Sequence, residues 1–168
     1  MFAGGELLTA KNLIGSYLQN KEKDTKKIMS DFNDKYIKRT DFMRGKSKYI
    51  VDKLPENFLY LGYILKFLPK VKVIRLFRDP WDTAISLYKQ RYVQNIPFSS
   101  SFFNIGVFMA NFEAINLYWN KSIENKDERI LDLFYEEIVQ DDSTAQKKIY
   151  RFLEIHASYS KDDRDKFF

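Results

Sequence analysis

Short apolar runs alternate along the chain with longer segments in which apolar residues recur every three or four positions. The predicted strands cover residues 49–51, 71–77 and 128–133, and the second is nearly continuously apolar apart from Lys72 and Arg75. Nearly continuous apolar runs of this length are typical of buried parallel strands. The helical spacing predicts helices over residues 7–19, 28–43, 56–68, 80–92, 102–123 and 143–153. Strands that alternate with helices predict an α/β fold, with a parallel sheet flanked by helices.

The junction after the second of these strands joins an apolar run directly to the start of a helix. Arg78 follows the apolar run, Asp79 is a residue type that caps helices, and Pro80 suits the first helical position. Ligands of open α/β sheets bind outside the carboxyl ends of the strands. The stretches expected at this edge are Asp52-Lys53, Arg78-Asp79 and Tyr135-Glu136-Glu137.

The composition is that of one globular domain, which we assign to residues 1–168. Hydrophobic residues make up 45% of the chain, enough for one core. There is no cysteine and a single histidine, His156, so we expect neither disulfides nor a metal site. No apolar stretch has the length of a membrane span, and the N-terminus does not resemble a signal peptide. We therefore expect a cytoplasmic protein.

The charge narrows the choice of ligand only slightly. The formal net charge is +5, which favours an anionic ligand but also fits a surface with a mild excess of lysine. The sequence contains no block of five consecutive basic residues, so we expect no nucleic-acid partner.

Arg78 and Ser86 are the first candidates for binding an anion. A guanidinium at a strand end can hold a phosphate with two parallel hydrogen bonds, and Ser86 can add a hydroxyl from two helical turns further on. Free backbone N–H groups at the helix start also favour anions. Alternatively, Arg78 pairs with Asp79, Asp82 or another nearby carboxylate, and Ser86 is a tolerated polar residue. The residues alone leave both interpretations open.

Lys53 and Glu6 are further candidates, each with a simpler explanation beside it. Lys53 at a strand end can neutralise or protonate a leaving oxygen, but it can also be a solvated lysine before a turn. Glu6 follows Gly4-Gly5 and can act as a general base, or as a carboxylate that a helix N-terminus favours. The turn at residues 44–47, RGKS, lacks the upstream glycines of a phosphate-binding loop.

Four stretches, in the same order, resemble the sulfotransferase family. RDPWDTAISLYKQ, residues 78–90, resembles the segment that binds the cofactor 3′-phosphate, which follows a strand, begins R-D-P-x-D and has a serine eight residues after the arginine. IVDKLPENFLYLGYILKFLP is similar to the bacterial run DK-x-P-x-N-F-x-x-L-G, and ILDLFYEEIVQD to Y-E-D-L-V-x-D. FAGGEL resembles the G-E segment of protein-tyrosine sulfotransferases and their bacterial, often TPR-linked, relatives. The resemblance covers roughly residues 2–155.

The resemblance implies a P-loop-NTPase-like sulfotransferase fold and sulfuryl transfer from 3′-phosphoadenosine 5′-phosphosulfate to a hydroxyl. The acceptor could be a protein tyrosine, a sugar or a small molecule, and residues 93–104 are the expected acceptor loop. By the same resemblance, Arg78 and Ser86 bind the 3′-phosphate. Glu6 would be the catalytic base, and Lys53 would stabilise the bridging oxygen.

The resemblance also implies that parts of the family fold are missing. The strand–loop–helix unit that cradles the 5′-phosphosulfate should precede the G-E segment, and a closing segment should follow the C-terminus. We therefore expect an N- and C-terminally truncated domain with an incomplete sheet, completed by an oligomer or another chain, and doubtful activity alone. The alternatives are a non-catalytic remnant that binds a nucleotide 3′-phosphate or a protein partner, and a basic interaction module without a nucleotide role.

Overall fold

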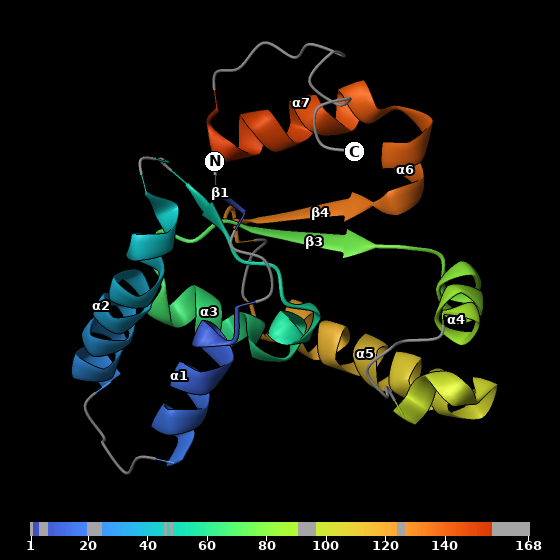
Figure 1. Cartoon of the computed structure of the whole chain (residues 1–168), viewed down its shortest axis with the longest axis horizontal. Coiled ribbons are helices and arrows are strands. Elements are labelled where there is room, and N and C mark those ends of the chain that lie inside the picture. The colour runs from blue at the N-terminus through green and yellow to red at the C-terminus, as the bar shows by residue number, and fades with distance from the viewer. Residues whose placement is uncertain are drawn as a thin grey trace. The chain divides into compact units, whose positions relative to one another are not determined.

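The elements follow one another in the alternating order that the sequence predicts (Figure 1). The computed structural model describes residues 2–3, 7–19, 25–45, 47, 49–90, 97–123 and 127–155. The chain divides into two compact units, which are described separately below. The first unit comprises residues 1–71 and 107–127, and the second comprises residues 72–106 and 128–168. No helix in the described part of the chain is long and apolar enough to cross a membrane.

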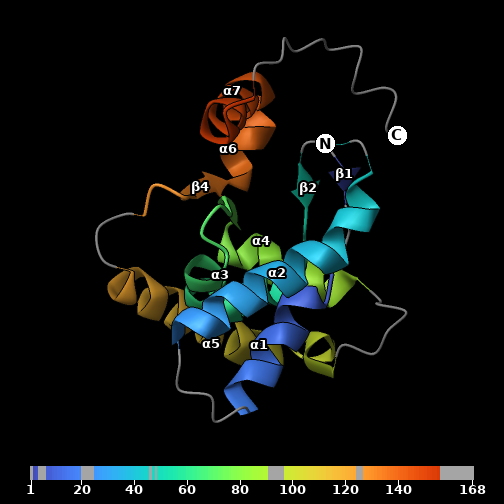
Figure 2. The same ribbon diagram turned by 90° about the vertical axis from the view of Figure 1, so that its left-hand side faces the viewer.

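The first unit contains a small parallel sheet and a mainly helical core. Strand β1 (Phe2–Ala3) pairs in parallel with β2 (Ile50–Val51), as Figure 2 shows. The helices are α1 (Thr9–Gln19), α2 (Thr25–Arg44), the 3-10 helix η1 (Pro55–Tyr60), α3 (Leu61–Phe67) and most of α5 (Phe102–Ser122). Its core residues include Leu13, Ile14, Phe32, Leu61, Leu65 and Phe67. Aromatic packing joins α2 to α3, since the Phe32 and Phe67 rings lie 4.9 Å apart.

Trp119 of α5 is packed tightly against α3. Its indole N–H donates a 2.9 Å hydrogen bond to the Phe58 carbonyl, which fixes the ring. The ring lies directly over Gly62, where a Cβ atom would come within 2.3 Å of the Trp119 Cζ3 atom. Gly62 therefore allows this close approach of helix and indole, because it has no side chain.

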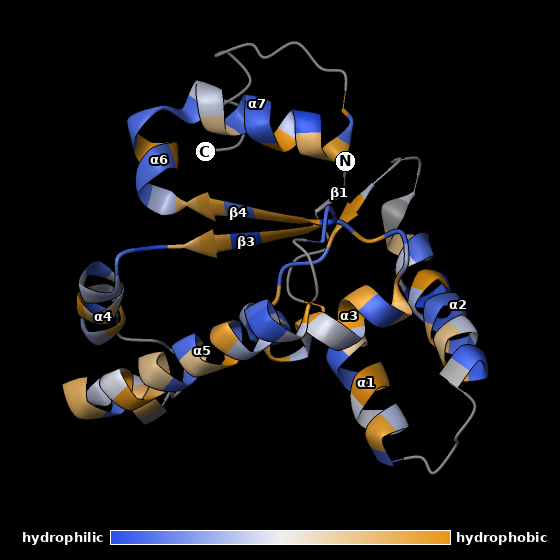
Figure 3. Cartoon of the chain, turned by 180° about the vertical axis from the view of Figure 1, so that it is seen from behind, coloured by the Kyte–Doolittle hydropathy of each residue, from blue (hydrophilic) through white to orange (hydrophobic). Residues whose placement is uncertain are grey.

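The second unit is built on β3 (Val73–Phe77) and β4 (Ile130–Phe134), which pair in parallel over five residues. The remaining elements are α4 (Pro80–Lys89), the 3-10 helix η2 (Pro97–Ser100), α6 (Tyr135–Gln140) and α7 (Asp142–Leu153). Figure 3 shows both strands as largely hydrophobic. Their charged residues, Arg75 and Asp132, lie opposite each other in the register and form a two-point pair with both N–O distances at 2.6 Å. This pairing explains how an apolar strand accommodates Arg75.

Several sequence predictions are confirmed and others need correction. The strands at 71–77 and 128–133, and the long helix at 102–123, are present. The predicted parallel strand pairing is confirmed, but the described strands form two two-stranded sheets instead of one sheet. Sequence periodicity does not reveal strand β1, since two residues are too few to show a period. The helix predicted over 56–68 is divided into η1 and α3.

The end of the helix predicted at 80–92 also differs from the prediction. Helix α4 ends at Lys89 and Gln90 is extended, while residues 91 and 92 lie outside the described part. The assignment of residues 1–168 to a single domain stays a prediction, as does the loss of terminal parts of the family fold.

We expect Gly62→Ala to destabilise the protein by about 1–3 kcal/mol, because the added methyl group would overlap the fixed Trp119 ring. Gly15→Ala in α1 is the matched control. Nothing lies within 4 Å of a Cβ there, so the higher helix propensity of alanine should stabilise by about 0.5–1 kcal/mol. Urea denaturation measures both changes, and a Gly62→Ala variant as stable as the wild type would contradict this packing.

Candidate functional site

The parallel register of β3 and β4 continues past the ends of both strands. The last registered pair is Phe77 with Phe134, so the next residues on each strand are Arg78 and Tyr135. The Arg78 guanidinium lies over the Tyr135 ring, 4.7 Å from its centroid. One residue further, the Asp79 backbone N–H donates a 2.8 Å hydrogen bond to Glu136 Oε1. Two of the three predicted strand-end stretches therefore meet at one edge of this sheet.

Asp79 caps α4, as the sequence predicts. Its Oδ1 accepts hydrogen bonds from the backbone N–H groups of Trp81, at 2.8 Å, and Asp82, at 2.9 Å. We expected free backbone N–H groups at this helix start to help bind an anion. That expectation needs correction, because the N–H groups of Trp81 and Asp82 already donate to Asp79. Anion binding at this junction would therefore depend mainly on side chains.

The carboxylate partners suggested for Arg78 are not observed. Within the described part of the chain, Arg78 forms no ion pair, and the Asp79 carboxylate faces the helix backbone instead. Arg78 is exposed, so its donors can reach a ligand, while the ring of Tyr135 restricts the guanidinium plane. Ser86 is half-buried on α4, and no described residue accepts or donates a hydrogen bond at its hydroxyl.

The first unit has its own strand ends, and the candidate Lys53 follows one of them. Lys53 lies two residues beyond β2 and is exposed, whereas the preceding Asp52 is half-buried. The Tyr36 hydroxyl donates a 2.8 Å hydrogen bond to Asp52 Oδ2. Burial raises the pKa of Asp52, and the hydrogen bond from Tyr36 offsets part of this rise. Burial, with the nearby Asp52 charge, also raises the pKa of Tyr36.

The four predicted site residues are thus distributed over both units. Arg78 and Ser86 belong to the second unit and Lys53 to the first, while Glu6 lies outside the described residues. The stretch RGKS marks the end of α2, where Gly45 has a φ of 56° that suits a helix C-terminus. It is a helix terminus in the structure.

Sequence reasoning missed the specific contacts that support these residues. Tyr135 and Glu136 were placed at the correct edge, but their partners Arg78 and Asp79 were not foreseen. The pairing of Tyr36 with Asp52 was also missed. A strand register would have indicated the first set of contacts, because it aligns residue 78 with residue 135. Sequence periodicity carries no comparable signal for Tyr36.

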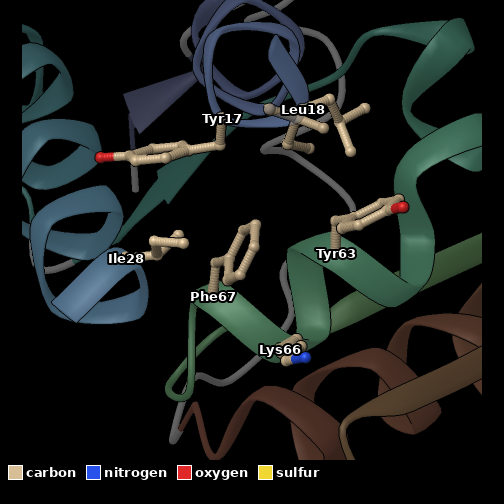
Figure 4. A pocket seen from close by; sticks show the side chains of 7 residues that line it. Tyr17, Leu18, Ile28, Tyr63, Lys66 and Phe67 are labelled. Carbon is tan, nitrogen blue, oxygen red and sulfur yellow. The ribbon is translucent and has the colours of Figure 1, made fainter. Parts of the chain in front are cut away.

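A separate apolar cavity lies in the first unit, between α1, α2 and α3 (Figure 4). Its volume is about 170 Å³, and it is lined by Ile14, Tyr17, Leu18, Ile28, Tyr63, Lys66 and Phe67. This lining carries one positive charge, so the cavity does not resemble a site for a nucleotide with several phosphates. No cluster of three or more His, Cys, Asp or Glu side chains suited to a metal ion occurs among the described residues.

Comparison with known proteins assigns the family. A family model described as "Sulfotransferase family" matches residues 11–159. The chain belongs to the sulfotransferase family. An uncharacterized protein of Aquifex aeolicus (strain VF5) is 30% identical over 123 residues, covering 71% of this chain. The chain spans only 16% of the length of that relative. No solved structure matches the chain.

The matched family is one of transferases. The match includes the second unit's Arg78 junction and the β2 end with Lys53. It begins after Glu6, so it gives no support for the role of that residue.

Replacing the cap of α4 should destabilise the junction. We expect Asp79→Ala to lower the free energy of unfolding by about 1 kcal/mol, because two backbone N–H groups lose their acceptor. Asp79→Asn retains a capping oxygen and should stay within a few tenths of a kcal/mol of the wild type. Chemical denaturation tests the pair, and equal losses for both variants would show that the cap is not responsible.

Proposed function

We propose that this protein transfers a sulfuryl group from 3′-phosphoadenosine 5′-phosphosulfate to an acceptor hydroxyl. The observation that carries the proposal is Arg78: an exposed guanidinium at the carboxyl end of a parallel strand, oriented by Tyr135, with no carboxylate partner in the described chain. An exposed arginine that forms no ion pair with a described carboxylate is a suitable receptor for a phosphate, which it can bind at two points.

The residues present fit the 3′-phosphate end of this donor. Arg78 supplies parallel N–H donors, and Ser86 supplies a hydroxyl whose hydrogen-bonding capacity is not used within the described chain. The carboxylates of Asp79 and Glu136 are close to this junction, but both accept from backbone N–H groups. Because these two carboxylates already accept hydrogen bonds from the backbone, they compete less with a bound phosphate for the Arg78 guanidinium.

Lys53 and Glu6 are the residues that the proposal assigns to the transfer step. When bound, the donor supplies an activated sulfuryl group. Lys53 would neutralise negative charge that develops on the bridging oxygen, and Glu6 would accept the proton of the acceptor hydroxyl. Such a transfer depends on positioning and electrostatics more than on covalent catalysis, as in phosphoryl transfer.

A protein tyrosine, a sugar and a small alcohol all fit as acceptors. The described part of the proposed acceptor loop includes η2 and the start of α5, where Phe103 is 78% exposed. An exposed aromatic ring at this position fits contact with an apolar part of an acceptor.

A second candidate function is a binding module without catalysis. This candidate is favoured because Arg78 and Ser86 both belong to the second unit. A nucleotide 3′-phosphate could therefore bind there without Lys53 or Glu6. A measurement of sulfuryl transfer distinguishes this binding module from an enzyme. A measurement of nucleotide binding does not, because both candidates bind the nucleotide.

Removing the Arg78 guanidinium should weaken nucleotide binding. We expect Arg78→Ala to reduce the affinity for adenosine 3′,5′-bisphosphate by about 2–3 kcal/mol, the loss of a charge-assisted two-point contact. Isothermal titration calorimetry measures the change. Arg151→Ala on α7 is a control in the same unit, also an exposed arginine, and it should bind as the wild type does.

Binding of the bisphosphate by wild type and Arg78→Ala with equal affinity would contradict the proposed role of Arg78. A wild-type protein that shows no binding at all would overturn both candidate functions, because each depends on this phosphate contact.

Lys53→Ala should separate catalysis from binding. We expect turnover to fall about 10²–10³-fold, as when one group that stabilises developing charge is removed, with little change in bisphosphate affinity. A radiolabelled donor and a panel of tyrosine peptides, sugars and small alcohols provide the assay. Transfer that is unaffected by Lys53→Ala would rule out this role, and a wild type that binds without transferring would favour the binding module.

A further inference from the structure

The cavity between α1, α2 and α3 is apolar at its floor and positively charged at its opening (Figure 4). Ile14 and Phe67 form the floor, since they are only 0% and 7% exposed. Leu18, which is 60% exposed, and the exposed Lys66 lie at the opening. This arrangement is typical of small-molecule sites, which bury an apolar body and use a few polar groups to orient it.

Three aromatic rings frame the cavity, and contacts outside it hold two of them in place. The Phe67 ring lies 6.2 Å from the Tyr17 ring and 6.0 Å from the Tyr63 ring. The Tyr17 hydroxyl donates a hydrogen bond to Asp31 on α2, so the ring and not the hydroxyl faces the cavity. Phe67 packs against Phe32 at a ring distance of 4.9 Å. These contacts keep the rings from turning inward to fill the space.

Lys66 gives the opening a positive charge that its surroundings leave unpaired. Within the part of the chain that the structure describes, Lys66 forms no ion pair and the Tyr63 hydroxyl forms no hydrogen bond. None of the lining residues carries a carboxylate. The cavity therefore matches a ligand that carries a negative group beside its apolar part.

The volume of about 170 Å³ limits the apolar part to a single ring. In other proteins, apolar cavities of about 150 Å³ bind benzene. An aromatic ring suits this lining, because it can pack edge to face against the tyrosine and phenylalanine rings. Such a ligand would also restore the packing contacts that the floor of an empty cavity lacks.

We propose that this cavity binds a small aromatic anion, with its ring against Ile14 and Phe67 and its negative group beside Lys66. The inference does not rest on the proposed function, because none of Lys53, Arg78 and Ser86 lines the cavity. It adds a second binding site, in the first unit, to the proposed phosphate contact in the second.

Methyl NMR with two probes of similar size tests the site in the full chain. Benzoate has one ring and a negative charge, whereas benzyl alcohol has the same ring and no charge. We expect both probes to shift the methyl resonances of Ile14, Leu18 and Ile28 in a saturable way, with a benzoate dissociation constant on the order of 1 mM. Benzoate should bind about two- to fivefold more tightly than benzyl alcohol, as suits one exposed charge pair.

The charge is tested by Lys66→Met, which keeps the unbranched stem of the side chain and removes the ammonium group. We expect this variant to bind benzoate as weakly as benzyl alcohol, with the affinity for benzyl alcohol unchanged. Lys70→Met is the matched control, because Lys70 is also exposed and follows α3 but does not line the cavity. It should bind benzoate as the wild type does.

The location is tested by Leu18→Trp, which should obstruct the opening and weaken the binding of both probes about tenfold or more. Leu18 is mostly exposed, so the variant should still fold. Leu8→Trp is the control, since Leu8 is 51% exposed and lies outside the cavity lining. Wild-type methyl resonances that do not shift would overturn the proposal. Equal affinities for benzoate in the wild type and Lys66→Met, or binding that Leu18→Trp leaves intact, would also overturn it.

Discussion

The parallel register of β3 with β4 is the constraint on which the candidate phosphate site depends. Because Phe77 lies opposite Phe134, the next residues of the two strands emerge side by side. The ring of Tyr135 therefore lies under Arg78, and Glu136 reaches the Asp79 backbone N–H. The cross-strand pair of Arg75 and Asp132 supports the same register from within the strands. A shift by one residue would separate all of these partners.

The first unit also has a parallel strand pair, but a shorter one. Its two strands are only two residues long each, so backbone pairing alone constrains their ends weakly. Side-chain contacts through Asp52 and Tyr36 supplement that pairing. In both units, a residue of proposed chemical importance lies just beyond the end of a parallel strand, and an aromatic side chain contacts that strand end.

The sequence predicted features that depend on local patterns and missed those that depend on distant partners. The strand at residues 73–77, the cap at Asp79 and Pro80 as the first residue of α4 all follow from consecutive residues. The pairing of Phe2–Ala3 with β2 joins residues far apart in the chain, and nothing local indicates it. For the candidate site, the sequence singled out Arg78 but did not predict its contact with Tyr135, because only the strand register brings these residues together. Family membership came from ordered motifs, and the match over residues 11–159 confirms it.

The central claim is that the strand-end arginine recognises the 3′-phosphate of a nucleotide. Its most direct test is an NMR titration of the wild-type protein with adenosine 3′,5′-bisphosphate and, separately, with adenosine 5′-monophosphate, which lacks the 3′-phosphate. We expect the bisphosphate to shift the resonances of the Arg78 side-chain N–H, the Ser86 amide and the Tyr135 ring, and the monophosphate to have much smaller effects on them. Equal shifts with both nucleotides, or shifts that spare Arg78 and Ser86, would show that Arg78 does not recognise the 3′-phosphate.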